Sequence, residues 1–274
     1  MWKKQSSKKP KVLLANLPWE KGELRGVRAG SRWPHIKDKS EGGYLPFPFF
    51  LAYSAALLKK HDIEAEVIDG IAEEIPADKF MDSLSRREFD ILVAETSVPS
   101  FDYDIKLLRE ISSLGVPIVL CGPQPWMYEE GFLDGHKFVK FVLYGEYEWT
   151  LLELMQALSQ GERDFSAISG LIWRDAGGRV MKNARREPFP IDTLPWPERA
   201  GLPMEKYWDL PGGIPQPSVQ MVASRGCTFG CNFCLWPQVL FGGRTYRARD
   251  VQDVVNEMEY LIREKGYKSV YFDD

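Results

Sequence analysis

The stretch Cys227-Thr-Phe-Gly-Cys231-Asn-Phe-Cys234 places three of the chain's four cysteines within eight residues. Three thiolates on one short loop are one fewer than the four Cys ligands that a [4Fe–4S] cluster normally takes. A cluster held by this loop would therefore keep one iron open, as a catalytic zinc site keeps a position for substrate. An open iron can bind a small molecule and reduce it.

The segments around the cysteine loop predict a parallel βα unit. A short apolar strand is expected over 218–224, followed by a turn at Arg225-Gly226. A helix is expected over 250–265 and a second strand over 268–272, because the helix carries its apolar residues on one face: Val251, Val254, Val255, Met258, Leu261 and Ile262. The order strand, loop, helix, strand is typical of the first unit of a parallel barrel.

Two other uses of the cysteines stay open but are less favoured. A structural zinc site needs a fourth ligand, and the fragment around the loop offers no His and no second Cys pair. Inert thiols are the second alternative, whereas a disulfide would leave one cysteine over. The spacing and the flanking elements favour the iron–sulfur interpretation.

Upstream of the loop, strands and helices alternate in the rhythm of an open parallel sheet. Five buried strands are expected at 11–16, 65–68, 90–95, 117–121 and 141–144, and helices at 49–60, 77–87, 103–114 and 148–159. The fold class is therefore α/β, with a Rossmann-like parallel sheet before the βα unit. Cys121 ends a buried strand and is expected to be a core thiol.

Ligands of such sheets bind at the carboxyl ends of the strands. Those ends carry Asn16-Leu17-Pro18, Thr96-Ser97, Gly122-Pro123 and Gly145-Glu146. No G-x-G-x-x-G follows the first strand, so a dinucleotide site is not expected. The alternative is a sheet that binds nothing, in which Ser97, Gly122 and Gly145 are plain turn residues.

The C-x3-C-x2-C spacing, with Phe233 before the last cysteine, resembles the radical S-adenosylmethionine (SAM) superfamily. A five-stranded domain directly upstream resembles the cobalamin-binding domain of cobalamin-dependent radical SAM enzymes. The matching segments are Asn16-Leu17-Pro18, Gly26 to Pro34, Ser97, Cys121-Gly122-Pro123 and Tyr144-Gly145-Glu146. Together with the cysteine loop, the resemblance covers essentially the whole chain.

The resemblance implies three cofactors and the residues that hold them. Cys227, Cys231 and Cys234 would hold the [4Fe–4S] cluster, and its open iron would bind SAM. Phe233, Asp273 and Asp274 are expected near SAM. The expected cobalamin contacts are Asn16, Pro18, Ser97, Gly122, Pro123, Gly145 and Glu146. No residue is assigned a catalytic role.

One departure from methionine synthase-type cobalamin domains bears on the cobalt. Those domains carry D-x-H-x-x-G after the first strand, and its His ligates cobalt; this chain has no such motif. The three histidines, His35, His61 and His136, lie outside that context and are expected at the surface or in loops. Cobalamin is therefore expected base-off, without a protein His ligand.

The function implied by the resemblance is methyl transfer from methylcobalamin to an unactivated carbon or phosphorus, with SAM also supplying a 5′-deoxyadenosyl radical. Two alternatives remain, namely a cyclase or rearrangement enzyme that uses cobalamin without methyl transfer, and a non-catalytic cobalamin-binding fragment. The methylthiotransferase branch is disfavoured because its N-terminal domain brings three further cysteines, whereas only Cys121 precedes this loop. A small-molecule substrate and an electron donor such as flavodoxin or ferredoxin are the expected partners.

Length and composition set the organisation. The 274 residues predict about two domains. We expect the cobalamin-binding domain over 10–160, a hairpin turning at Gly177-Gly178 and a Pro-rich linker over 161–217, and the start of the radical SAM domain over 218–274. Trp196, Tyr207 and Trp208 are expected to pin the linker down. Since about six βα units make the family's barrel, we expect a truncated piece of a longer protein, which alone need not be active.

Charge and hydropathy exclude several other classes. The net charge of −4 gives no indication of a nucleic-acid partner. The longest apolar stretch, Leu45 to Leu58, is interrupted by Pro46 and Pro48 and is too short to span a bilayer. No signal-peptide core follows the basic N-terminus, so we expect no membrane insertion and a reducing cytoplasm.

Overall fold

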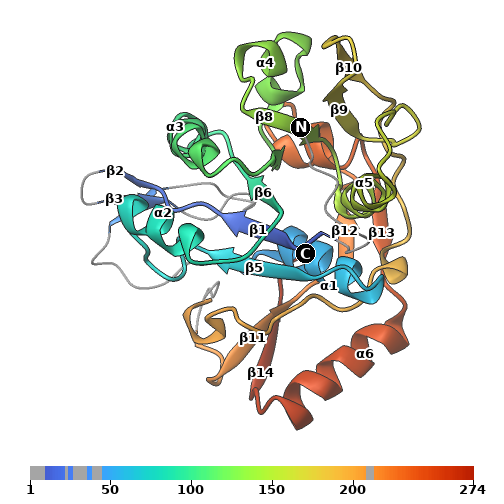
Figure 1. The fold of residues 1–274 in the computed structure, drawn as a ribbon. Coiled ribbons are helices and arrows are strands. Elements are labelled where there is room, and N and C mark those ends of the chain that lie inside the picture. Colours follow the sequence, from blue (N-terminus) through green and yellow to red (C-terminus); the bar gives the residue numbers. More distant parts are fainter. Residues whose placement is uncertain (1–9, 22–23, 27–35, 39–44, 208–212) are drawn as a thin grey trace.

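The computed structural model describes residues 10–21, 24–26, 36–38, 45–207 and 213–274. Its largest element is a seven-stranded sheet in the order β10-β9-β8-β7-β6-β1-β5 (Figure 1). Five adjacent strands, up to the edge strand β5, run parallel and are β1 (Val12–Asn16), β5 (Ala65–Asp69), β6 (Ile91–Glu95), β7 (Ile118–Cys121) and β8 (Val139–Leu143). All five were predicted from their apolar runs, and the α/β fold class is confirmed.

Helices cover both faces of the sheet, as the alternation of elements predicts. One face carries α1 (Phe49–Lys60) and α5 (Glu148–Gln160), and the other carries α2 (Ala77–Ser85), α3 (Phe101–Ile111) and α4 (Glu130–Gly135) (Figure 1). Strands β1, β6 and β7 are buried throughout because apolar layers cover them on both sides. Cys121 is fully buried in one of these layers, so the expectation of a core thiol is confirmed.

The expected hairpin forms β9 (Leu171–Arg174) and β10 (Val180–Lys182), and it extends the large sheet. Strand β9 pairs antiparallel with β8, and β10 pairs antiparallel with β9. The hairpin's own sequence gives no sign of this pairing, because strand partners far along the chain are chosen by tertiary contacts. The division into domains at residue 160 stays a prediction.

The segment around the cysteines forms two small sheets. Strands β11 (Ser218–Met221) and β14 (Ser269–Phe272) pair in parallel, with α6 (Val251–Glu259) and the π-helical turn η6 (Tyr260–Glu264) between them in the chain. The predicted strand, loop, helix and strand are therefore present. Figure 1 shows α6, β11 and β14 lying to one side of the large sheet.

The prediction of a turn at Arg225-Gly226 was wrong. These residues belong to β12 (Ser224–Gly226), which pairs antiparallel with β13 (Tyr246–Ala248), so Arg225 lies opposite Arg247. A turn was expected because glycine follows a polar residue, but the extended backbone is held by a strand twenty residues away. The cysteine loop and the π-helical turn η5 (Trp236–Leu240) connect β12 to β13.

Shorter elements complete the described chain. They are β2 (Glu20–Lys21), β3 (Leu24–Gly26), β4 (Ile36–Asp38), and the 3-10 turns η1 (Ser112–Leu114), η2 (Pro125–Tyr128), η3 (Ile191–Thr193) and η4 (Met204–Lys206). Strands β2, β3 and β4 form a small antiparallel sheet of their own. None of the helices in the described ranges has the length and apolar character needed to cross a bilayer.

The connecting segment before β11 is tied to both parts, as expected for two of its aromatic residues. Trp196 donates its indole hydrogen bond to Asp253 of α6 at 2.9 Å, and the Tyr207 ring packs 5.3 Å from that of Phe47. Trp208 and most of the Gly26 to Pro34 segment lie outside the described residues.

Candidate functional site

The structure brings the predicted cobalamin contacts to one edge of the large sheet. Asn16, Glu95 and Cys121 lie in register at the ends of neighbouring parallel strands. The remaining predicted contacts follow the ends of β1, β6, β7 and β8 within a few residues: Pro18, Ser97, Gly122, Pro123, Gly145 and Glu146. The chain leaves β1 for a helix on one face and enters β6 from a helix on the other, which makes this edge the topological switch point where α/β sheets bind ligands.

Asn16 offers a buried acceptor at this edge. Its side-chain nitrogen donates to Asp69 at 2.7 Å, but its side-chain oxygen is buried and has no hydrogen-bond partner among the described residues. A buried acceptor without a partner costs about 1–3 kcal/mol. A ligand that carries amide N–H groups, as a corrin ring does on its rim, could satisfy this oxygen. This residue therefore fits the predicted cofactor.

Ser97 belongs to a buried polar cluster that the sequence analysis did not find. Its hydroxyl lies 3.0 Å from that of Ser100, and Ser100 and Thr96 donate to Asp104 at 2.6 and 2.5 Å. Burial raises the pKa of Asp104 to about 7, although the hydrogen bonds from Ser100 and Thr96 lower it. The spacing of Ser100 and Asp104, four residues apart at a helix start, was the available signal.

Gly122 is required by the close packing of two strand ends. Its φ is +106°, and a Cβ at this position would lie 2.2 Å from the carbonyl oxygen of Thr96. Any other residue would push β6 and β7 apart at the predicted site.

Glu146 has a contact that the sequence analysis did not predict. Its carboxylate accepts hydrogen bonds from Arg225 at 3.2 Å and Arg247 at 2.7 Å, and both arginines belong to the strands that flank the cysteine loop. Both carboxylate oxygens of Glu146 are therefore occupied by these arginines, and the backbone of Glu146 is the part left for a ligand.

The three cysteines lie on one solvent-accessible loop between β12 and η5. Cys227 and Cys234 are half-buried and Cys231 is exposed. The carbonyl oxygen of Cys231 accepts from the amide nitrogen of Cys234 at 3.2 Å and from Gln238 at 2.7 Å, which curls the second half of the loop. Within the described chain, no three His, Cys, Asp or Glu side chains are gathered into a metal-ligand group. The donor set, three thiols on one loop, nevertheless fits a cluster with an open iron.

The three residues expected near SAM lie close to this loop in different ways. Phe233 is within the loop and 79% exposed. Asp274 accepts from the amides of Ala223 and Ser224 at 2.7 and 3.1 Å, just before the strand that leads to Cys227. The amide of Asp273 donates to the carbonyl oxygen of Met221 at 2.8 Å. Both aspartates therefore lie at the carboxyl ends of the small parallel sheet, as a barrel site requires.

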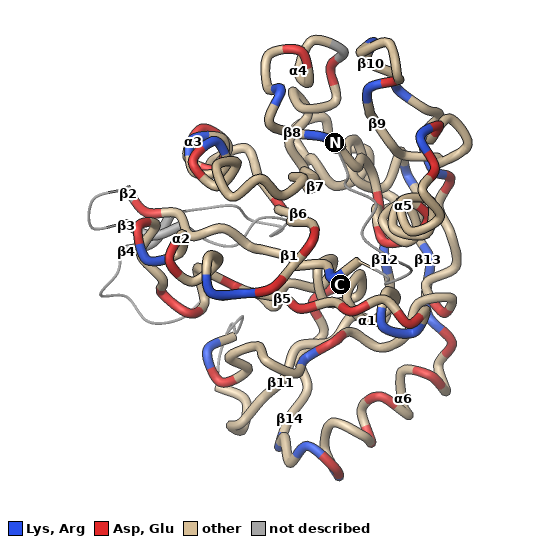
Figure 2. Tube along the Cα trace, in the orientation of Figure 1, with Lys and Arg blue, Asp and Glu red and all other residues tan. Residues whose placement is uncertain are grey.

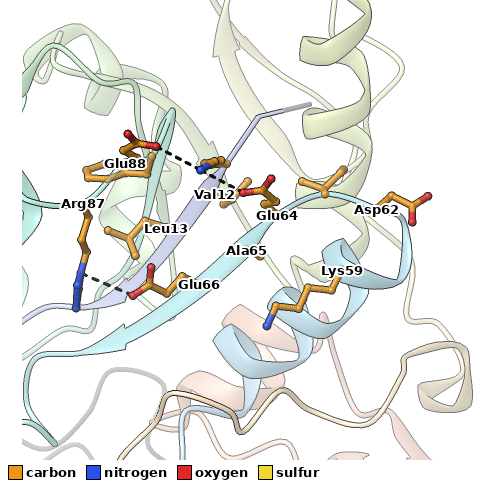
Figure 3. Close-up of a pocket in the computed structure, with 12 residues that line it drawn as sticks. Val12, Leu13, Lys59, Asp62, Glu64, Ala65, Glu66, Arg87 and Glu88 are labelled. Atoms are coloured by element: carbon orange, nitrogen blue, oxygen red, sulfur yellow. Dashed lines mark hydrogen bonds and ion pairs between the residues drawn. The ribbon is translucent and has the colours of Figure 1, made fainter. Parts of the chain in front are cut away.

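A second groove lies at the opposite edge of the sheet. It has a volume of about 490 Å³ and is lined by the amino ends of β1 and β5 (Figure 3). Its charged side chains are paired, since Lys11 lies 3.4 Å from Glu64 and 3.5 Å from Glu88. A smaller pocket of about 200 Å³ lies at the carboxyl edge beside Pro18, Trp19 and Gly70. We favour the smaller pocket because sheets of this class bind ligands at carboxyl edges.

The described histidines lie away from the carboxyl edge. His61 follows the C-terminal end of α1, and His136 follows that of α4, where its ring nitrogen lies 2.8 Å from the carbonyl oxygen of Phe132. Both helix ends face the amino edge of the sheet, since helices in such units run antiparallel to the strands. His35 lies outside the described residues.

The chain is related in sequence to curated proteins over most of its length. It is 31% identical over 232 residues to an uncharacterized methyltransferase of Pyrococcus horikoshii, covering 83% of this chain and 48% of the relative. It is 26% identical to the cytidylyl-2-hydroxyethylphosphonate methyltransferase of Streptomyces wedmorensis, covering 83% and 51%. It is 24% identical to the anaerobic magnesium-protoporphyrin IX monomethyl ester cyclase of Rubrivivax gelatinosus, covering 79% and 39%. The chain thus spans 39–51% of the length of these relatives, and no family model matches it.

Two solved structures share the fold. The cobalamin-dependent SAM radical enzyme OxsB with aqua-cobalamin bound superposes with a TM-score of 0.71 at 17% identity, over 98% of this chain and 34% of that one. The radical SAM methyltransferase TsrM of Kitasatospora setae, with cobalamin and a [4Fe–4S] cluster bound, gives a TM-score of 0.65 at 19% identity, over 97% and 49%. The arrangement of the α/β sheet and the cysteine segment is therefore shared with these enzymes.

Proposed function

Because these comparisons confirm the resemblance to cobalamin-dependent radical SAM enzymes, we propose that the chain is the N-terminal portion of such an enzyme and that the enzyme is a methyltransferase. The methyl acceptor would be an unactivated carbon or phosphorus centre of a small molecule. The observation that carries the proposal is the direct contact between the carboxyl edge of the large sheet and the strands flanking the three cysteines, made by Glu146. Two cofactor sites facing one substrate need this proximity.

Each residue would act by holding or orienting a group. When bound, the cluster with SAM supplies one-electron reduction and radical chemistry, and cobalamin supplies a transferable methyl group. Cys227, Cys231 and Cys234 would hold the cluster. Asp274 keeps the start of the cysteine loop in place through the amides of Ala223 and Ser224. The expected contacts of SAM remain Phe233, Asp273 and Asp274.

On the cobalamin side, the strand-end residues would hold the corrin ring without a histidine on cobalt. The positions of His61 and His136 behind the amino edge support this part of the proposal. Asn16 would accept a hydrogen bond from the ligand, and Ser97, Gly122 and Gly145 would bring their backbones against it. A flavodoxin or ferredoxin would supply electrons, and the cytoplasm would be the compartment.

The test is anaerobic reconstitution followed by metal and corrinoid analysis. The wild-type chain should bind about four irons and show a base-off cobalamin spectrum. Replacing Cys227, Cys231 and Cys234 together by alanine should remove the iron and leave cobalamin binding unchanged. Iron that stays bound to the triple variant would contradict the cluster assignment, and a wild-type chain that binds no corrinoid would contradict the cobalamin site.

The sequence relationship to the magnesium-protoporphyrin ester cyclase supports a second candidate, a cyclase or rearrangement enzyme. Reconstituted protein incubated with methyl-labelled SAM and a strong reductant separates the two. Label that moves onto the corrinoid supports a methyltransferase. Reductive cleavage of SAM with the label left on methionine supports the cyclase. A bound corrinoid without iron supports a cobalamin-binding fragment without turnover.

A further inference from the structure

Buried ion pairs join the large sheet to the strands that flank the cysteine loop. The two carboxylate oxygens of Glu146 are shared between Arg225 of β12 and Arg247 of β13, and Arg225 also lies 2.7 Å from Glu148 at the start of α5. The side chains of Glu146, Glu148 and Arg225 are at most 5% exposed. Figure 2 shows basic positions on β12 and β13 close to α5. We call Glu146, Glu148, Arg225 and Arg247 the charge clamp.

Arg225 is held on its remaining sides by aromatic rings. Its guanidinium lies 4.7 Å from the ring centre of Phe50 and 4.9 Å from that of Tyr53, both on α1. Although burial lowers the pKa of Arg225, Glu148 and Glu146 raise it above its ordinary value. A desolvated cation is tolerated only where such partners surround it, so the position of Arg225 is strongly determined.

The clamp lies next to the first cysteine because only Gly226 separates Arg225 from Cys227. Gly226 has a φ of +104°, and a Cβ there would lie 2.0 Å from the carbonyl oxygen of Thr245. A side chain at this position is therefore excluded. Gly226 also pairs with Tyr246 of β13, so the backbone that leads from Arg225 to Cys227 is held by the neighbouring strand and a displacement of Arg225 would move Cys227.

The other end of the cysteine loop rests on the same strand end. Arg185 donates to the carbonyl oxygens of Val239 and Leu240, which close the turn after Cys234. A Cβ on Gly145 would lie 3.4 Å from the Arg185 guanidinium and 3.5 Å from the Leu240 carbonyl oxygen. Both ends of the loop thus contact the pair Gly145-Glu146, which is also part of the predicted cobalamin edge.

We propose that Glu146, Arg225 and Arg247 are positioning residues that couple the two cofactor sites, so that ligand binding at the strand ends and iron binding at the cysteine loop strengthen each other. The inference rests on the proposed function. A ligand that orders Gly145-Glu146 also orders both arginines, and a cluster that orders the loop presents Glu146 in its ligand-bound position. Because linkage between two binding equilibria is reciprocal, either cofactor can report the coupling.

The experiment measures the affinity for hydroxocobalamin by absorbance titration, with iron-loaded and iron-free protein. Wild type should bind about tenfold more tightly when loaded with iron. A charge-balanced variant, Glu146→Gln with Arg247→Met, removes one charge of each sign and should bring this ratio close to one. Iron content and circular dichroism of the variant verify that it folds and still takes up the cluster.

Glu153→Gln is the matched control. Glu153 lies on α5 and forms an ion pair with Arg186, which is not on the cysteine strands, so its removal should leave the tenfold ratio intact. A wild-type ratio within twofold of one, or a ratio kept by the charge-balanced variant, would overturn the coupling while leaving the proposed function standing. Failure of the wild type to bind either corrinoid or iron would remove the proposed function and the inference together.

Discussion

The seven-stranded sheet and the two-stranded sheet β11–β14 are stabilised by different forces. Strands β1, β6 and β7 are buried between two apolar layers. Among the described residues, the small sheet has a core cluster of three buried apolar side chains, Val219, Met221 and Leu261, and Phe272 at its edge is 39% exposed. The large sheet can be explained by hydrophobic burial alone, whereas the small one cannot.

Charged contacts compensate for the small core. Arg249 lies 2.6 Å from both Glu257 and Asp253 of α6, and its guanidinium also donates to the carbonyl oxygen of Val222 at 2.8 Å. Arg199 of the connecting segment donates to the Gln220 carbonyl oxygen at 2.8 Å. Arg249 thus holds the cysteine-bearing part together and Arg199 ties it to the connecting segment, while Arg225 joins it to Glu148 of α5. The stability of this part should therefore depend on its arginines.

The largest effect should come from Arg225→Met, which tests that dependence directly. The substitution leaves Glu148 buried without its cation, so we expect a loss of about 3–5 kcal/mol in the free energy of unfolding. Burial already raises the pKa of Glu148 and Arg225 lowers it, so removal of Arg225 should raise this pKa further. Urea unfolding measures the loss. The double variant Arg225→Met with Glu148→Gln should recover part of it, and a loss below about 1 kcal/mol would mean that the arginine is dispensable.

Two leucines compare the cores of the two parts. Leu92→Ala in β6 and Leu261→Ala in η6 each remove a buried side chain and should each cost about 2–5 kcal/mol locally. Hydrogen exchange followed by mass spectrometry shows how far the destabilisation spreads in each variant. Leu92→Ala should lower protection in every element, whereas Leu261→Ala should lower it only in β11, β14 and α6. Equal loss of protection in β1 and β6 for both variants would show a single cooperative unit.

The same contrast explains what the sequence could predict. The runs 12–16, 91–95 and 118–121 are apolar enough to identify strands, and α1 was predicted with its observed bounds because its composition and flanks are local signals. The pairing of β9 with β8 and of Arg225 with Arg247 could not be predicted, because each joins residues that are distant in sequence.

For the candidate site, the sequence predicted which residues lie at the strand ends but not which hydrogen bonds they form. Asn16, Ser97 and Gly122 were predicted at strand ends, and parallel topology brings them to one edge. Glu146 was predicted for the same reason, yet its bonds to Arg225 and Arg247 span 79 and 101 residues. Asp104 was missed because its raised pKa comes from burial, and no local sequence pattern reports burial.

Asp104 predicts a pH dependence that belongs to the large sheet. Its pKa is about 7 in the folded chain, against an ordinary value of 3.8. Between these values the folded state keeps a proton that the unfolded state releases, so stability falls as pH rises through this window, by up to about 1.4 kcal/mol per pH unit. Urea unfolding of wild type and Asp104→Asn at pH 5, 6 and 7 isolates the contribution. If the free energies of unfolding of the two proteins change with pH in the same way, the pKa of Asp104 is not raised in the folded chain.

The smallest effect concerns how α1 and α6 begin. Helix α1 has no side-chain cap at Pro48, but nine of its residues are buried. Helix α6 buries only Glu257 and is capped by Asp250, whose carboxylate accepts from the amides of Gln252 and Asp253 at 2.9 and 3.1 Å. Since packing contributes little to α6, Asp250→Ala should cost about 1 kcal/mol. The loss should appear as faster hydrogen exchange in the first turns of α6.

Asp250→Asn is the matched control for this cap, because asparagine caps a helix about as well as aspartate and should keep the exchange rates near those of wild type. Unchanged exchange in α6 after Asp250→Ala would mean that Arg249 alone holds the helix start through Asp253 and Glu257. In that case arginines would hold the start of α6 as well as the attachment of the cysteine-bearing part to the large sheet. The cysteine-bearing part would then depend on charged contacts even more strongly than its small core indicates.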